Sequence, residues 1–155
     1  MNFLNPKLLL KLKSWCDRQE RCHSELREKL RKEKIYGQSA EEYIATLISE
    51  NYINESRFAQ AFVSGKFRIK NWGRNKIIQH LKSKRISEYC IKEGLLEIEE
   101  KEYLEILKKV LKKKIRDYQS EKNPYLLKNK VAKYTMSRGF EGDLVWKHLN
   151  QLVKT

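Results

Sequence analysis

Apolar residues recur three and four positions apart along most of the chain, which is the spacing that places them on one face of an α-helix. Over residues 101–119 the apolar stripe is Leu104, Leu107, Leu111, Ile115 and Tyr118, and lysines fill the positions turned away from it. The alternation with period two that is typical of β-strands is absent. The pattern therefore predicts an all-α protein.

Capping residues mark where several of these helices begin. Candidate N-caps in front of apolar runs are Asn54, Ser87 and Asn123, the last of them followed by a proline at the first helical position. Ser39 together with Glu42 fits a capping box. Gly73 interrupts the middle of the chain and is expected to separate two helices.

Three segments can be superimposed on one another, which indicates internal repeats. They are ELREKLRKEKI at 25–35, KIIQHLKSKRI at 76–86 and KVAKYTMSRGF at 130–140. A single offset of 54 positions pairs Ile77 with Val131, Ile86 with Phe140, Ile91 with Val145, Leu95 with Leu149, and Ile98 with Leu152. An offset of 51 positions pairs the first segment with the second.

The superposition predicts three tandem three-helix repeats, each with a long first helix, at residues 1–53, 54–99 and 100–155. We expect an elongated, curved arrangement in which each unit contacts its neighbours, and a monomer, because units that cover one another need no second copy. The third unit has Gly139 before its closing apolar residue, where a left-handed C-cap favours glycine, whereas the first two have Lys34 and Arg85. Those two helix ends are expected to carry modest strain or to close differently.

Positive charge is concentrated in one stretch. The chain carries 34 Lys and Arg against 20 Asp and Glu, a formal net charge of +14. Residues 57–87 hold nine of the basic residues and no acidic one. Such a field favours a polyanion, which can be nucleic acid, an anionic lipid surface or the acidic face of a protein. Because ordinary helix faces mix both signs, we interpret the stretch as a binding ridge.

The candidate binding residues are Arg57, Lys66, Arg68, Lys70, Trp72, Arg74, Lys76, Lys82, Lys84 and Arg85. A helical projection places Phe58, Phe62, Gly65 and Ile69 on one face, which we expect to be core, with basic residues on both flanks. Trp72 is suited to stack on a base or on an arginine of a partner. Packing between helices is the favoured interpretation for this tryptophan, as it is for Trp15 and Trp146.

No arrangement of residues typical of catalysis or cofactor binding is found. His23, His80 and His148 are far apart in sequence and have no nucleophile and base set around them. Glycine-rich phosphate and dinucleotide motifs are absent. Cys16 and Cys22 lack the second ligand pair that structural zinc needs. We therefore expect no enzyme activity, no cofactor and no metal.

No segment is typical of a membrane span or of a secretory signal. The longest apolar run, Leu8 to Leu10, is far below the roughly 20 residues that a spanning helix needs. Lysines at 7, 11 and 13 interrupt any apolar core of a signal peptide. We expect a cytoplasmic protein whose three cysteines stay reduced.

The central segment, residues 53–86, reads INESRFAQAFVSGKFRIKNWGRNKIIQHLKSKRI. This segment resembles the central signature of the RecX family of bacterial recombinase regulators. The shared features are an acidic residue, Arg-Phe-Ala, a basic helix, an aromatic-Gly pair and Ile-x-x-x-Leu. RCHSELREKL before it and SRGFEGDLVWKHL after it are similar to the first and last repeats of that family. The resemblance covers roughly residues 10–153. It departs from the family at Lys84-Arg85-Ile86, where Lys-Gly is frequent.

The resemblance implies a regulator that has no chemistry of its own and binds the RecA recombinase. Family members are understood to lodge in the groove of the RecA filament on single-stranded DNA and to limit filament growth, ATP hydrolysis and strand exchange. Recombination, DNA repair and the SOS response would be affected, and DNA would be contacted weakly and without sequence preference. Charge reversal at Arg57, Arg68 and Arg74 is then expected to weaken inhibition without loss of helical content.

Two other interpretations stay open. A DNA-binding helical module that acts without RecA would use the same charge, and its affinity for duplex DNA would fall with salt by about 0.9 in log-log slope per phosphate neutralised. An enzyme would show a turnover that disappears when one His or Cys is replaced.

Overall fold

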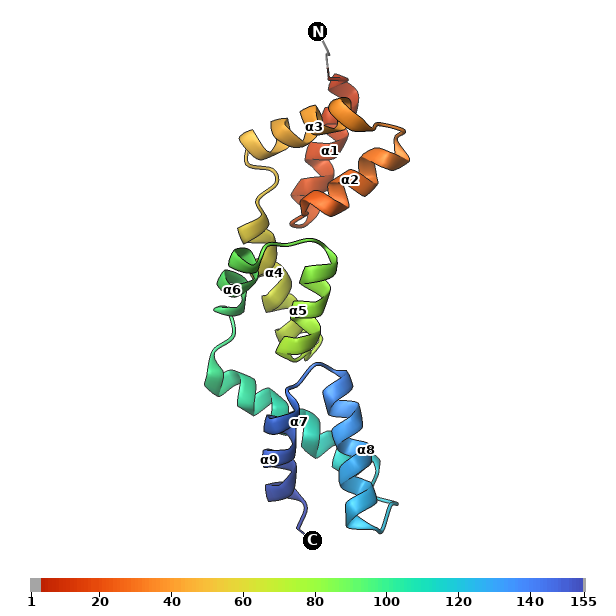
Figure 1. Ribbon diagram of the computed structural model, residues 1–155, viewed down its shortest axis with the longest axis vertical. Coiled ribbons are helices and arrows are strands. Elements are labelled where there is room, and N and C mark those ends of the chain that lie inside the picture. The colour runs from red at the N-terminus through yellow and green to blue at the C-terminus, as the bar shows by residue number, and fades with distance from the viewer. Residues whose placement is uncertain (1–3, 155) are drawn as a thin grey trace. The chain divides into compact units, whose positions relative to one another are not determined.

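The computed structural model describes residues 4–154, and every regular element in this range is helical (Figure 1). The elements are α1 (Pro6–Arg18), α2 (His23–Lys32), α3 (Gly37–Ser49), α4 (Glu55–Arg68), α5 (Arg74–Ser83), α6 (Glu88–Leu95), α7 (Glu100–Asp117), α8 (Pro124–Ser137) and α9 (Gly142–Leu152). No strand occurs among the described residues, so the prediction of an all-α fold is confirmed. The unit boundaries after residues 53 and 99 stay a prediction.

The chain divides into two compact units, each defined by the contacts that its residues make with one another. The first contains α1 to α3, the start of α4 and residues Leu81–Gly94, and the second contains Phe62–His80 together with the chain from Leu95 onward. The core of the first unit includes Leu12, Leu26, Leu30 and Leu47, all completely buried. In the second unit α7, α8 and α9 pack against one another around Tyr103, Leu107, Leu111, Val131 and Leu149, which are also completely buried.

Most of the apolar positions paired by the repeat are core positions in both copies. The pairs in which both residues are buried are Ile77 with Val131, Ile86 with Phe140, and Ile91 with Val145. Leu95 is half-buried and Leu152 is exposed, so the correspondence weakens toward the end of each segment.

The three superimposed segments close with the same helix end. Left-handed dihedrals occur at Lys34 (φ 62°), Arg85 (φ 61°) and Gly139 (φ 103°). The N–H of the following residue donates to a carbonyl five positions earlier: Ile35 to Leu30 at 2.9 Å, Ile86 to Leu81 at 3.1 Å, and Phe140 to Thr135 at 3.5 Å. This is the Schellman arrangement. The first two ends therefore do not close differently, and a residue with a Cβ in this conformation costs roughly 1–2 kcal/mol.

Three of the predicted helix caps are confirmed. The side-chain oxygens of Asn54, Ser87 and Asn123 accept N–H groups from the first turns of α4, α6 and α8 at 2.9, 3.2 and 2.9 Å. The predicted capping box at Ser39 is wrong. Helix α3 begins earlier, at Gly37 after an N-cap at Tyr36, so Ser39 lies inside the first turn.

The predicted apolar face of α4 needs a correction at its C-terminal end. Ile69 is 78% exposed, because α4 ends at Arg68 and Ile69 lies in the turn that follows. The buried residues of α4 are Phe58, Ala59, Val63 and Phe67. The helical projection thus identified Phe58 but shifted the rest of the core face.

Two loops of the second unit meet at the level of the backbone around Gly73 and Gly139. The Gly73 N–H donates to the carbonyl of Arg138 at 2.8 Å, and the Asn75 N–H donates to the carbonyl of Gly139 at 2.9 Å. A Cβ built on Gly73 would lie 2.3 Å from the carbonyl carbon of Gly139, and one on Gly139 would lie 2.4 Å from the Cβ of Lys76. Only glycine permits this approach at both positions.

We expect Gly73→Ala to lower the free energy of unfolding by roughly 2–3 kcal/mol, because its methyl group overlaps backbone that cannot move aside easily. Gly65→Ala is the matched control, since Gly65 lies inside α4 and a Cβ there meets no atom within 4 Å. That change should stabilise the helix by up to about 1 kcal/mol. Urea unfolding followed by circular dichroism measures both, and similar effects of the two changes would contradict the close approach.

Candidate binding surface

Folding supplies the carboxylates that the stretch 57–87 lacks. Four of the predicted binding residues form ion pairs with acids outside the stretch: Arg57 with Glu20 (2.6 Å), Arg68 with Glu102 (3.2 Å), Arg74 with Glu100 and Glu141 (3.0 Å to the latter), and Lys84 with Glu25 (3.1 Å). These four side chains connect segments of the fold, so a partner that bound them would have to compete with these carboxylates.

Arg57 of the first unit fastens the turn after α3. Its Nε donates to Glu20 at 2.6 Å, and its guanidinium also donates to the carbonyl and the side chain of Asn51 at 3.0 and 3.2 Å. Asn51 has a left-handed φ of 64°. Arg57 therefore stabilises an unusual backbone conformation as well as an ion pair.

Arg74 of the second unit occupies the most elaborate polar cluster among the described residues. Its guanidinium lies 3.8 Å from the ring centroid of Tyr103 and pairs with Glu141 and Glu100. The Tyr103 hydroxyl accepts the backbone N–H of Arg74 at 3.0 Å and donates to Glu141. The start of α5 is thus joined to α7 and to the residue before α9.

The protonation states in this cluster are fixed by burial and by the carboxylates. Burial on its own would lower the pKa of Arg74, but the hydrogen bonds to Glu141 and Glu100 outweigh it and the pKa is raised. Burial, with the hydrogen bond to Glu141, raises the pKa of Tyr103. At neutral pH the arginine is charged and the phenol is a donor, as the geometry requires.

Arg68 connects the end of α4 to the chain before α7. Its guanidinium donates to the Ser64 hydroxyl at 2.6 Å, to the Glu97 carbonyl at 2.9 Å and to the Glu102 carboxylate at 3.2 Å. The hydrogen bond to Glu102 raises the pKa of Arg68. Since the pair is largely exposed, we expect its contribution to stability to be small.

Lys66, Trp72 and Lys76 form a second kind of group, which we call the tryptophan cluster. The Nζ atoms of Lys66 and Lys76 lie 4.9 and 4.5 Å from the Trp72 ring centroid. The indole is half-buried, with the His80 ring 4.6 Å away and the Phe62 ring edge-on at 6.4 Å. Such cation–π contacts contribute about 0.5–1 kcal/mol each at exposed sites. They position the two ammonium groups without neutralising them.

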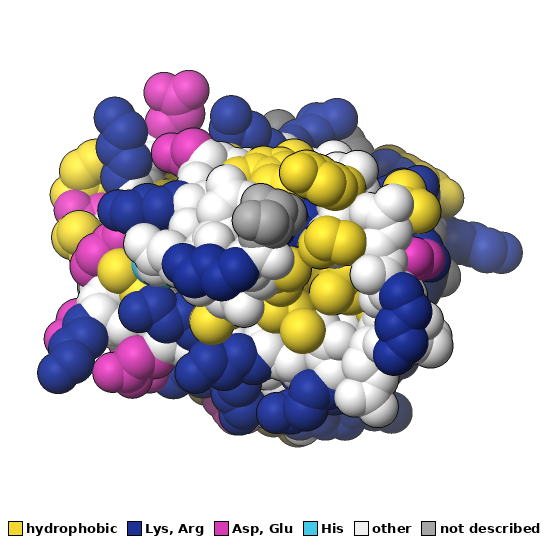
Figure 2. Space-filling model, turned by 90° about the horizontal axis from the view of Figure 1, so that it is seen from below, with side chains coloured by type: hydrophobic (Ala, Val, Ile, Leu, Met, Phe, Trp, Pro, Cys, Tyr) yellow, Lys and Arg dark blue, Asp and Glu magenta, His cyan; other side chains and the backbone are white. Residues whose placement is uncertain are grey.

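Lys70, Lys82 and Arg85 are exposed, and within residues 4–154 no ion pair involves them. Exposed basic residues also occur elsewhere: the polar face of α7 carries Lys108, Lys109, Lys112, Lys113 and Arg116, all exposed. Figure 2 shows one face of the molecule on which Lys and Arg predominate around a patch of hydrophobic side chains. Contact with an aromatic ring separates Lys66 and Lys76 from these exposed basic residues of α7, although Arg21 and Lys29 lie over the Trp15 ring in a similar way.

The structure adds residues that the sequence did not single out. A cavity in the first unit is lined by Arg27, Arg31, Lys84 and Arg85, together with His23, Ser24 and Glu55. Only Lys84 and Arg85 were among the predicted binding residues. The available signal was the spacing of Arg27 and Arg31, which lie four apart and so share one face of α2.

Neither the cysteines nor the acids of residues 4–154 assemble a metal site, because no group of three or more His, Cys, Asp or Glu is suitably placed. Burial raises the pKa of Cys16 to about 11, and it also raises the pKa of Cys22. These thiols are therefore protonated and unreactive at neutral pH. Over the same residues no helix is both long enough and apolar enough to cross a membrane.

Comparison with known families decides the relationship. A model described as RecX, second three-helix domain, matches residues 54–95, and one described as RecX, third three-helix domain, matches residues 100–149. Together they cover more than half of the chain. The chain belongs to the RecX family. The resemblance found in the sequence is confirmed.

Several proteins named regulatory protein RecX are similar to this chain. The relative from Lactobacillus gasseri is 29% identical over 132 residues, 84% of this chain and 48% of the relative. That from Haemophilus influenzae strain PittEE is 28% identical over 127 residues, 81% of this chain and 82% of the relative. That from Bacillus cytotoxicus is 27% identical over 147 residues, 94% of this chain and 54% of the relative. The chain thus spans about half the length of two of them.

Solved RecX structures have the same fold. The crystal structure of RecX from Lactobacillus salivarius matches with a TM-score of 0.80 and 22% identity, over 94% of each chain. A second crystal structure, of a regulatory protein RecX, matches with a TM-score of 0.83 and 22% identity, over 94% of this chain and 70% of the other. At this identity the agreement concerns the helical architecture.

We expect Arg74→Glu to lower the free energy of unfolding by roughly 3 kcal/mol, because it places a third carboxylate beside Glu100 and Glu141. Lys70→Glu makes the same charge change at an exposed position without an ion pair and should stay within about 0.5 kcal/mol. Urea unfolding measures both. Equal stability of the two variants would show that the Arg74 cluster does not hold the second unit together.

Proposed function

We propose that this member of the RecX family binds the RecA filament on single-stranded DNA and inhibits its growth, ATP hydrolysis and strand exchange without catalysing a reaction itself. The supporting observation is membership of a family whose curated members are named regulatory proteins, with similarity over 81% and 94% of the chain in two of them. Recombination, DNA repair and the SOS response are the processes that such inhibition affects. The protein acts as a cytoplasmic monomer.

In this proposal each of three repeats contacts the partner as one module. The repeats are residues 1–53, 54–99 and 100–155. The family models for the second and third three-helix domains support the two later modules. A repeat chain suits a helical filament, because successive modules can contact successive subunits with similar surfaces.

The ten predicted binding residues take two roles. Arg57, Arg68, Arg74 and Lys84 are engaged by carboxylates and serve the fold. Lys66, Trp72 and Lys76, with the exposed Lys70, Lys82 and Arg85, contact the partner. An ammonium group is a compact point charge that pairs with phosphates and carboxylates alike, which suits a filament made of both protein and DNA.

Nucleic-acid binding without RecA is the second candidate function, and the tryptophan cluster favours it. Proteins that bind single strands combine aromatic platforms for bases with positive groups that follow the phosphates. A half-buried indole with two ammonium groups within 5 Å of its centre supplies both elements. The two functions share a surface and differ in whether RecA is required.

ATP hydrolysis by the cognate RecA on single-stranded DNA, titrated with this protein at two salt concentrations and with DNA in excess, tests the proposal. We expect inhibition at amounts well below the RecA concentration, because so few molecules cannot mask the DNA. Inhibition that follows DNA coverage and disappears with salt would favour the second candidate instead.

A triple variant locates the surface in the same assay. Lys66→Gln, Lys70→Gln and Lys76→Gln together should raise the half-inhibitory concentration about tenfold or more, equivalent to about 1.4 kcal/mol of lost binding. The control variant combines Lys109→Gln, Lys112→Gln and Lys113→Gln, which remove the same charge from the exposed face of α7. It should change the half-inhibitory concentration by less than about threefold. Equal effects would mean that net charge, not the tryptophan cluster, determines inhibition.

A further inference from the structure

A cavity in the first unit brings together cationic side chains from two segments far apart in sequence. Its volume is about 350 Å³. The lining residues are Arg27 and Arg31 from α2, Lys84 and Arg85 just after α5, and His23, Ser24 and Glu55. Four positive side chains therefore face one carboxylate, and no apolar side chain belongs to the lining.

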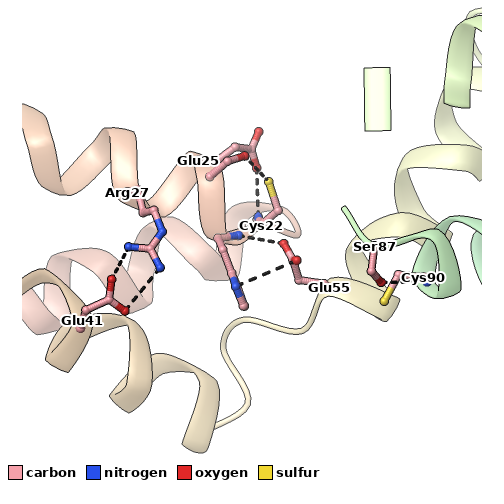
Figure 3. Close-up of polar contacts among 9 residues, drawn as sticks. Cys22, Glu25, Arg27, Glu41, Glu55, Ser87 and Cys90 are labelled. Atoms are coloured by element: carbon pink, nitrogen blue, oxygen red, sulfur yellow. Dashed lines mark hydrogen bonds and ion pairs between the residues drawn. The ribbon is translucent and has the colours of Figure 1, made fainter. Parts of the chain in front are cut away.

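Acids outside the lining hold three of the four cations in place. The pairs are Arg27 with Glu41, Arg31 with Glu28, and Lys84 with Glu25. Figure 3 shows the fork of Arg27 facing Glu41 of α3. A guanidinium has five N–H donors, so a carboxylate on one side leaves donors free for a ligand on the other. Arg85 is exposed, and no ion pair involves it among the described residues.

The carboxylate of Glu55 is engaged by the first residue of α2. Its Oε2 accepts the backbone N–H of His23 at 3.0 Å, and its Oε1 lies 4.0 Å from Nδ1 of the same residue (Figure 3). Within residues 4–154 no ion pair links Glu55 to any of the four cations. The Glu55 carboxylate is therefore directed at α2 and is not paired with any of the four cations. Because the neighbouring carboxylates balance the four cations in formal charge, an anion would be held by hydrogen bonds from the cationic groups rather than by an excess of charge.

We propose that this cavity binds a phosphate group. Three arginines at one site match the several oxygens of a phosphate through paired hydrogen bonds, and the lysine adds a point charge. The lining consists of charged groups, one hydroxyl and the His23 imidazole, without Phe, Tyr or Trp, which favours phosphate over a base. The phosphate is carried either by a nucleic-acid strand or by a free nucleotide, since the same chemistry recognises both. The inference does not rest on the role toward RecA.

Arg85 permits a test in which the fold is not put at risk. With φ at 61° it has a conformation that asparagine tolerates better than arginine, so Arg85→Asn removes the charge without loss of stability. Lys34→Asn is the matched control. Lys34 has φ 62°, is exposed, belongs to the first unit and does not line the cavity.

Inorganic phosphate is the first probe, titrated into ¹⁵N-labelled protein and compared with sodium chloride at equal ionic strength. We expect saturable shifts confined to the backbone amides of residues 23–27 and 84–85 in the unmodified protein and in Lys34→Asn. In Arg85→Asn the apparent Kd should rise about tenfold, as expected for one charge-assisted contact. Diffuse shifts that chloride reproduces, or equal effects of the two variants, would overturn the proposal.

Two further titrations distinguish the two possible sources of the phosphate. One uses an oligo(dT) strand that has no terminal phosphates, and the other uses ATP. Movement of the same amides by the strand assigns the site to nucleic-acid phosphodiesters, and movement by ATP alone assigns it to a nucleotide. If neither ligand moves them, the proposal is wrong. RecA is absent from these titrations, so their failure leaves the inhibition assay unaffected.

Discussion

The backbone contact between Gly73 and Gly139 is the constraint on which the second unit depends. Two hydrogen bonds, at 2.8 and 2.9 Å, join the loops that carry these glycines, and neither position has room for a Cβ. Because Arg74 and Glu141 come one and two positions after these two glycines, they lie close enough to form an ion pair, and the Arg74 guanidinium lies over the buried ring of Tyr103. Trp72 precedes the same glycine, so the contact also sets where the tryptophan cluster lies.

The acid-free stretch has a structural explanation beside the binding role that we propose for it. Within each unit its basic residues pair with carboxylates from other parts of the chain: Glu20 and Glu25 in the first unit, and Glu102 and Glu141 in the second. Arginines take most of these pairs, as expected for groups that form several directed hydrogen bonds. Among the lysines, Lys84 pairs with Glu25, whereas Lys66 and Lys76 lie against an aromatic ring and Lys70 and Lys82 are exposed. The positive charge of the stretch therefore divides into side chains that pair with carboxylates of the fold and side chains that do not.

Local signals were readable in the sequence, and long-range ones were not. Caps at Asn54 and Asn123 depend on neighbouring residues, so their patterns predict them correctly, whereas the capping box at Ser39 was wrong because α3 begins at Gly37. The exposure of Ile69 was missed because a projection does not show where α4 ends. Arg74 pairs with Glu141, which lies 67 positions further along the chain, and no pattern in the sequence around either residue indicates this pair. The cavity beside Arg27 was missed for the same reason.

The fluorescence of Trp72 tests the central claim most directly, which is that the tryptophan cluster is the surface that meets the partner. With Trp15→Phe and Trp146→Phe, Trp72 is the sole tryptophan of the chain. Addition of RecA filaments on single-stranded DNA should then change its emission saturably, in proportion to the inhibition of ATP hydrolysis. Full inhibition with unchanged Trp72 emission would contradict the account and place the interface elsewhere.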